Sequence, residues 1–139
     1  MSNAFKEGRQ STFLAWMFRM PLIKRWALMF CVKPENIAEH SHQVAIVAHL
    51  LAIIRNKKFG GNINVDKVAT IALYHEASET RYGDIVSPTK YANPEIAREF
   101  KKIEYLAEKE CLASLPEEFQ ELFSDIIVQD NVDVIYKEI

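Results

Sequence analysis

The chain has 139 residues, of which 49% are hydrophobic and 26% are charged, and its formal net charge is -2. This length is typical of one domain with one hydrophobic core, and the composition excludes a disordered chain. A nucleic-acid-binding platform needs a strongly basic face, so the charge balance argues against that class of function. Glycine and proline are scarce, which favours long regular elements.

The N-terminal part predicts short helices. An apolar helical pattern covers Thr12 to Met20 and is expected to break near Pro21, because proline interrupts helical hydrogen bonding. We expect Ile23 to Phe30 to form a second short helical piece. Charged residues interrupt the apolar stretch from 13 to 30, so it predicts neither a signal peptide nor a membrane span. Residues 1–4 are interpreted as an expression remnant and are left out of fold reasoning.

A long helix is predicted from Glu35 to Asn56, followed by a stop at the paired glycines of Lys57 to Asn62. Apolar residues at steps of three and four predict its inner face: Val44, Val47, Ala48, Leu51 and Ile54. Asn64 is a suitable N-cap for a central helix from Val65 to Thr80. The inner face of that helix is expected to carry Val68, Ile71 and Ala72.

The C-terminal half continues the helical pattern. Turn residues predict a loop from Arg81 to Asn93, and Asn93-Pro94 is a typical helix start. Further helices are expected over 94–114, 117–128 and 132–139. No alternating strand pattern with hairpin turns occurs. The sequence therefore predicts a single all-α domain.

Two cysteines, Cys31 and Cys111, lie far apart in the sequence and outside any metal-binding spacing. We expect both to be free, buried thiols, as in proteins of a reducing compartment. This favours a cytoplasmic location.

The histidines provide the first indication of chemistry; they are His40, His42, His49 and His75. We interpret His42 and His49 as structural or surface residues, because no carboxylate lies near them on their helix face. His75 is followed by Glu76 and, one turn later, by Glu79. Imidazole and carboxylate ligands together suit Mn, Fe, Co or Zn. The spacing alone leaves three alternatives: a metal site, a buried salt-bridge network, or a surface patch.

Short motifs then follow one another along nearly the whole chain, from about Ser11 to Ile139. They are Arg25-Trp26, Glu39-His40-Ser41, Lys57-Lys58-Phe59-Gly60-Gly61-Asn62, Tyr74-His75-Glu76-Ala77-Ser78-Glu79, Gly83-Asp84 and Ser87-Pro88-x-Lys90-Tyr91. In order and spacing they resemble the bacterial HD-domain 5'-deoxynucleotidase family. The resemblance implies an all-α HD-domain helical bundle over residues 1–139, short at its C-terminus, that removes phosphate from deoxynucleoside 5'-monophosphates.

The resemblance also implies a divalent cation, with Co or Mn effective and Mg, Zn or Fe as further choices. His40, His75 and Glu76 match the family's metal ligands, and Glu79 matches the catalytic glutamate that positions or activates the attacking water. The resemblance further implies a cytoplasmic homodimer that acts on a free nucleotide, without a nucleic-acid or membrane partner.

Substrate-binding roles carry over to the positions that match. Arg25 and Trp26 match the pair that holds the nucleotide, and Asp84 matches an aspartate close to the sugar. Lys90 is expected to add positive charge near the site. Each role is physically reasonable, since a guanidinium suits a phosphate and an indole offers a flat face. Without the resemblance, Trp26 would be interpreted as a core aromatic and Lys90 as a solvated loop residue.

Two positions depart from the family pattern. Glu76 stands where the family has aspartate, and its extra methylene moves the carboxylate. The family's last metal-binding aspartate is expected a few residues beyond Ile139, and neither Asp130 nor Asp133 has the matching context. The alternative to an active phosphohydrolase is therefore a catalytically impaired homologue or fragment, serving as a nucleotide-binding, regulatory or purely structural dimerising module.

Overall fold

The computed structural model describes residues 11–139, so the expression remnant expected at residues 1–4 lies outside the described part. The chain folds into helices, in the order α1 (Phe13–Met17), η2 (Met20–Leu22), α2 (Ile37–Phe59), α3 (Val65–Tyr74), α4 (Glu79–Tyr82), α5 (Ser87–Lys90), α6 (Pro94–Ala113), α7 (Glu117–Ile127), η3 (Gln129–Asn131) and α8 (Val134–Lys137). Within residues 11–139 there is no strand, only an isolated bridge between Lys24 and Asn36. The predicted all-α class is confirmed.

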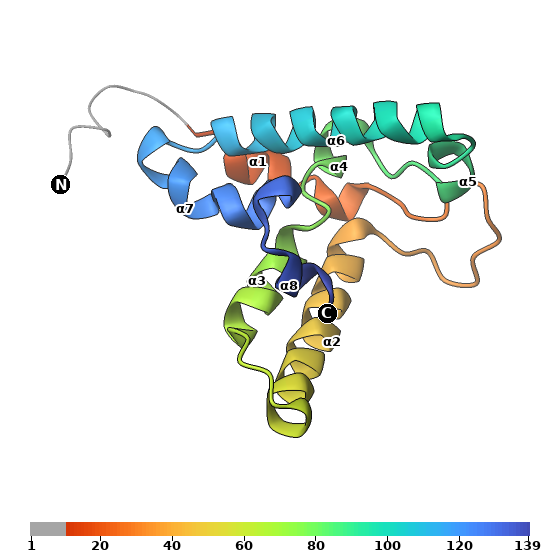
Figure 1. The fold of residues 1–139 in the computed structure, drawn as a ribbon. Helices are drawn as coiled ribbons and strands as arrows, with labels where there is room; N and C mark the ends of the chain where they lie inside the picture. Colours follow the sequence, from red (N-terminus) through yellow and green to blue (C-terminus); the bar gives the residue numbers. More distant parts are fainter. Residues whose placement is uncertain (1–10) are drawn as a thin grey trace.

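Helices α2 and α3 lie side by side and form one arm of the molecule (Figure 1). The connection between them follows the sequence signals. Gly60 closes α2 with a φ of 68°, a left-handed conformation that favours glycine. The side chain of Asn56 donates to the carbonyl of Ile63 at 2.9 Å and accepts its N–H at 3.0 Å. Asn64 then caps α3 by accepting the N–H of Lys67 at 3.0 Å, as predicted.

The inner face of α2 was wrongly predicted. Val47, Leu51 and Ile54 are exposed, whereas the buried stripe consists of Ile37, Ser41, Ala45 and Ala52. This helix is apolar on nearly every side, so its pattern does not single out one face. Alanines at the contact let α3 approach closely, because the distance between packed helices depends on side-chain size.

By length and composition alone, α2 is apolar enough to cross a membrane. In the structure it packs along α3, and its first turn contributes to a polar cluster with the end of that helix.

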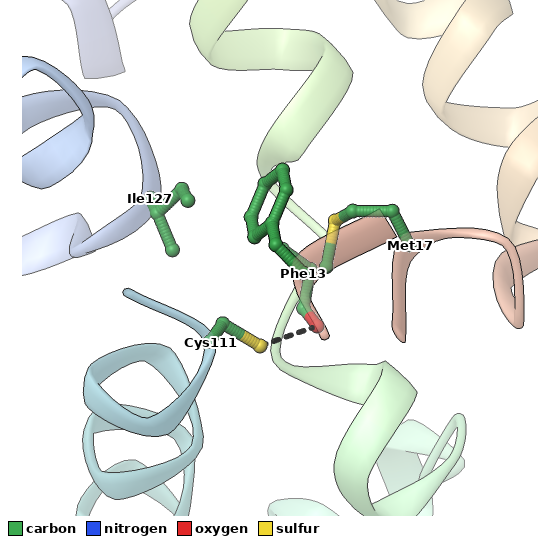
Figure 2. Close-up of a cluster of buried hydrophobic side chains, with 5 residues drawn as sticks. Phe13, Met17, Cys111 and Ile127 are labelled. Carbon is green, nitrogen blue, oxygen red and sulfur yellow. Dashed lines mark hydrogen bonds between the residues drawn. The ribbon is translucent and has the colours of Figure 1, made fainter. Parts of the chain in front are cut away.

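The second arm consists of α1, α6 and α7, with α6 running along its length (Figure 1). Its core joins Phe13, Met17, Ala77, Cys111 and Ile127 (Figure 2). Aromatic rings extend this cluster, since the rings of Tyr74 and Phe123 meet edge to face with centroids 5.8 Å apart. The core thus connects α1, α6 and α7 with the turn that follows α3.

Three further expectations were wrong. The central helix does not reach Thr80: α3 ends at Tyr74, and a turn over residues 75–78 separates it from α4. The expected helical piece from Ile23 to Phe30 is an irregular loop, because its backbone bonds across to residues 35–37 instead of forming helical turns. Cys31 lies in this loop and is exposed, whereas Cys111 is buried as expected.

Candidate metal and nucleotide site

The junction of the two arms holds a cluster of metal-ligand types. His40 comes from the first turn of α2, and His75 and Glu76 follow the end of α3. One ligand atom from each of the three side chains lies within 4.8 Å of the others. Oε1 of Glu76 lies 3.1 Å from Nε2 of His75 and 3.7 Å from Nε2 of His40. Residues 35 positions apart in sequence are therefore brought to one point.

Local structure explains how each ligand is held. Asn36 caps α2 by accepting the N–H of Glu39 at 2.9 Å, and the fully buried Ile37 anchors the same turn. On the other side, Ala77 is 1% exposed and inserts into the core cluster. Its carbonyl accepts the hydroxyl of Thr80 at 2.7 Å and the thiol of Cys111 at 3.4 Å, the contact marked by the dashed line in Figure 2. The turn that carries His75 and Glu76 is thus fixed by core packing.

The two imidazoles differ in their surroundings. Nδ1 of His75 lies 2.6 Å from the carbonyl of Ala72 and therefore carries a proton, so Nε2 is the nitrogen that could bind a cation. Nε2 also lies 3.1 Å from the Glu76 carboxylate; burial opposes the charge of His75, but this hydrogen bond outweighs it and raises the pKa of His75. Burial and the nearby charges of Arg25 and His75 lower the pKa of His40. A neutral imidazole with an available lone pair is the form that binds metals.

The two carboxyl groups are held in different states. Burial opposes ionisation of Glu76, but the hydrogen bond with His75 outweighs it and lowers the pKa of Glu76. Burial and the neighbouring Glu76 carboxylate raise the pKa of Glu79. Oε2 of Glu79 is buried without a hydrogen-bond partner among the described residues. One carboxylate therefore suits a cation, and the other carboxyl group is free to take or give a proton.

A charged clamp lies on the α2 side of the cluster. The guanidinium of Arg25 contacts Nδ1 of His40 and donates to Oε1 of Glu35 at 3.2 Å. The indole N–H of Trp26 donates to Oε2 of the same carboxylate at 3.0 Å, and this bond in particular lowers the pKa of Glu35. Trp26 has a φ of 62°, a conformation that costs a non-glycine residue about 1–3 kcal/mol. Strain of this kind persists only where the surroundings enforce it.

A cavity of about 430 Å³ opens beside the cluster. Its lining includes His75, Glu76 and Glu79, together with Lys90 and Glu104 from α5 and α6. Lys90 pairs with Glu104, and although burial opposes its charge, this pairing raises the pKa of Lys90. The cavity therefore has a positive group on the wall near the acidic cluster.

The other residues considered in the sequence analysis lie at different places relative to the cluster of His40, His75 and Glu76. Asp84 lies near enough to Glu79 to raise its pKa further. His49 lies 3.8 Å from Asp66 on a separate groove between α2 and α3, and that groove also includes His42. Asp133 caps α8 by accepting the N–H of Ile135 at 3.1 Å.

Sequence reasoning missed two carboxylates that contact candidate residues. Glu35 was assigned to the start of a helix, and Glu104 lies in the helix predicted over 94–114, where it was not considered for a role. Glu35 precedes an Asn N-cap, and residues before an N-cap are extended and free to point elsewhere, so its position was a usable signal. No comparable signal marks Glu104, because its partner Lys90 comes from another element.

These residues fit a divalent cation. Two imidazole nitrogens and one carboxylate oxygen form a mixed donor set of the kind that binds Mn, Co, Fe or Zn. Three protein ligands leave further coordination positions for water or substrate, as catalytic metal sites require. His40, His75 and Glu76 would hold the ion.

Comparison with known proteins identifies the family. The family model for YfbR-like 5'-deoxynucleotidases matches residues 12–139. A 5'-deoxynucleotidase from Vibrio vulnificus is 56% identical over 123 residues, which are 88% of this chain and 63% of that protein. The 5'-deoxynucleotidase YfbR of Escherichia coli is 50% identical over 119 residues, 86% of this chain and 60% of that protein. The chain thus spans somewhat less than two thirds of the length of these relatives.

Solved structures agree on the fold. An HD-domain phosphohydrolase from Listeria innocua superimposes with a TM-score of 0.73 and 25% sequence identity, over 84% of this chain and 55% of that chain. The predicted HD-domain architecture is confirmed. The family model matches almost the whole length of this chain, and the chain therefore belongs to the YfbR-like 5'-deoxynucleotidase family.

Proposed function

We propose that this chain carries the reaction centre of a metal-dependent phosphohydrolase that removes phosphate from deoxynucleoside 5'-monophosphates. One observation carries the proposal: the ligand atoms of His40, His75 and Glu76 lie within 4.8 Å of one another, with the guanidinium of Arg25 against the same cluster. A cation site beside a fixed guanidinium is suited to a phosphate monoester.

The cation, Mn or Co by preference, supplies charge stabilisation to the phosphoryl oxygens and acidifies water when bound. Arg25 binds the phosphate, and Trp26 provides a flat face for the sugar or base. Glu79 would take a proton from the attacking water in its ionised form: burial and Glu76 raise its pKa, and a cation held by the neighbouring ligands would favour the carboxylate that accepts the proton. The water oxygen bonds to phosphorus as the bond to the 5' oxygen breaks, and the released proton ends on that leaving oxygen.

The cavity beside the cluster receives the nucleoside part in this proposal. Lys90 contributes positive charge on its wall, and Asp84 lies close to the sugar. The names of the relatives support the substrate class, since they are 5'-deoxynucleotidases.

The decisive experiment measures phosphate release from a panel of deoxynucleoside 5'-monophosphates, with Mn or Co added to the 139-residue chain. We expect turnover that EDTA abolishes. Glu79→Ala is the matched variant: it should abolish turnover and leave Mn affinity largely unchanged, because its side chain is not one of the three ligands. Unchanged turnover in this variant would remove Glu79 from the mechanism.

A folded chain that binds Mn but releases no phosphate would contradict the proposed activity. A thermal-shift titration then separates the alternatives. Stabilisation by nucleotide that survives EDTA indicates a non-catalytic nucleotide-binding module, since a ligand that binds only the folded state raises stability. No effect of nucleotide indicates a structural, dimerising module.

The remaining expectations concern the setting of this activity. We propose a cytoplasmic homodimer that acts on a free nucleotide, without a nucleic-acid or membrane partner. Light scattering after size-exclusion chromatography tests the dimer, and a mass equal to one chain of 16.0 kDa would contradict it.

A further inference from the structure

We propose that Glu35 is a positioning residue for the nucleotide, acting through both Arg25 and Trp26. This inference rests on the proposed function, because it assigns the two side chains to substrate. It adds a residue that carries no expected contact with substrate of its own.

The contacts single out Glu35. Its two carboxylate oxygens are used separately: Oε1 accepts from the Arg25 guanidinium at 3.2 Å, and Oε2 accepts from the Trp26 indole at 3.0 Å. One carboxylate therefore fixes the relative orientation of the two side chains. The guanidinium carbon lies 5.1 Å from the centre of the Trp26 ring, so the pair is also stacked.

The backbone supports the same arrangement independently of the side chain. The N–H of Arg25 donates to the carbonyl of Glu35 at 3.0 Å, and the N–H of Ile37 donates to the carbonyl of Ile23 at 3.1 Å. These bonds close the base of the loop. Removing the carboxylate should leave the base closed and release only the side chains of Arg25 and Trp26.

The conformation of Trp26 shows why a positioning group is needed. Trp26 has a positive φ, which is unusual for a residue other than glycine, and the residue is 44% exposed. Packing alone therefore does not hold this ring. The hydrogen bond to Glu35 is its specific polar anchor in the described structure.

Kinetics provide the first test. Glu35→Ala should raise KM for deoxyadenosine 5'-monophosphate about tenfold, because it removes two hydrogen bonds to a charged group, and change kcat much less. Mn affinity should change less than KM, although Oε1 of Glu35 also lies 3.6 Å from Nδ1 of His40. Glu35→Gln keeps one good acceptor and should recover part of the loss. In the Arg25→Ala background, Glu35→Ala should add only the smaller loss that acts through Trp26, and in the Arg25→Ala/Trp26→Ala double variant it should add little.

Glu39→Ala is the matched control. Glu39 is an exposed glutamate in the first turn of α2, and its side chain makes no hydrogen bond within residues 11–139. It should keep the parental KM. A parental KM in Glu35→Ala, or an undiminished loss from Glu35→Ala in the Arg25→Ala/Trp26→Ala double variant, would overturn the proposal.

A spectroscopic readout separates this inference from the proposed activity. The chain has two tryptophans, so fluorotryptophan labelling gives two fluorine NMR signals. Glu35→Ala should shift the Trp26 signal and weaken its response to titrated deoxyadenosine 5'-monophosphate. The Trp16 signal should stay, because that ring lies 3.5 Å from the guanidinium carbon of Arg81, on α4. A parent without turnover would contradict the proposed function alone, whereas an unmoved Trp26 signal would contradict the role of Glu35.

Discussion

The two halves of the candidate site are built by different means. The metal side, at residues 75–79, is fixed by core packing, with Ala77 buried in the hydrophobic cluster. The nucleotide side, in the loop from 23 to 36, is fixed by polar contacts around Glu35, while Leu28, Phe30 and Val32 at its tip are largely exposed. Core packing holds the candidate metal ligands rigidly, whereas hydrogen bonds hold the candidate substrate-binding side chains and allow them to adjust. A mutation in the metal-binding half should therefore impair mainly metal binding, and a mutation in the loop should impair mainly substrate binding.

The largest expected effect is a loss of Mn affinity that leaves the substrate-binding loop unchanged. His75→Ala removes a nitrogen ligand and should weaken Mn affinity by a factor of about 100 or more, since even outer partners of metal ligands are worth 10–100-fold. Isothermal titration with Mn measures this loss. The Trp26 environment should remain parental, and a simultaneous change there would show that the two halves are coupled.

Helix α6 buries the carboxyl group of Glu108, and burial makes the charged form of this group unfavourable. Burial raises the pKa of Glu108 to about 7 from its ordinary 4.5, although the residue accepts the N–H of Gln129 at 3.1 Å. The folded state thus favours the protonated form. Its contribution to stability is full below pH 4.5 and is lost as the pH rises through 7.

Glu108→Gln keeps an acceptor for that N–H and removes the titration. It should raise the free energy of unfolding by about 3 kcal/mol at pH 8, at 1.36 kcal/mol per pKa unit, and by much less at pH 4.5. Chemical denaturation at the two pH values measures the difference. An equal change at both would show that ionisation of Glu108 is not the cause.

A change in the loop should affect substrate binding more than metal binding. Arg25→Ala should raise KM for deoxynucleotides about tenfold or more, through the loss of a charge-assisted contact to phosphate, and should change Mn affinity less than His75→Ala does, through the lost contact with His40. Steady-state kinetics and Mn titration together test this. Arg25→Lys should recover little, because an ammonium cannot present the same fork of donors.

The smallest expected effect concerns the stability of the helical fold and not the candidate site. Asn64→Ala removes the N-cap of α3 and should lower the free energy of unfolding by about 1 kcal/mol. Because the cap lies at the far end of α3 from His75, KM and Mn affinity should not change. Altered Mn affinity in this variant would mean that the whole helix, and not the turn after it, sets the ligand geometry.

Local signals made the helix ends predictable. Asn64 and Asn93 cap their helices as expected, and Gly60 ends α2 in a left-handed conformation. The choice of buried face on α2 was not predictable, because its apolar residues surround the helix and the small residues at the contact decide the packing. The turn at residues 75–78 was missed for a related reason: its sequence is compatible with helix, and only the tertiary burial of Ala77 breaks it.

For the site, the sequence motifs indicated which residues to consider, and the structure brings His40, His75, Glu76 and Arg25 together. Glu35 could not be ranked in the same way, since its importance lies in reaching two side chains at once across an irregular loop. Contacts of this kind depend on side-chain direction, which helical periodicity does not describe.

The bridge between Lys24 and Asn36 has a consequence for the evolution of this site. It closes the base of the loop beside Arg25, Trp26 and Glu35, so the segment between Trp26 and Glu35 can change in length or sequence while these three residues keep their places. Lengthening a surface loop costs little, because closure entropy grows slowly with loop length. The tip around Phe30 is therefore where new substrate preferences could be acquired without rebuilding the reaction centre.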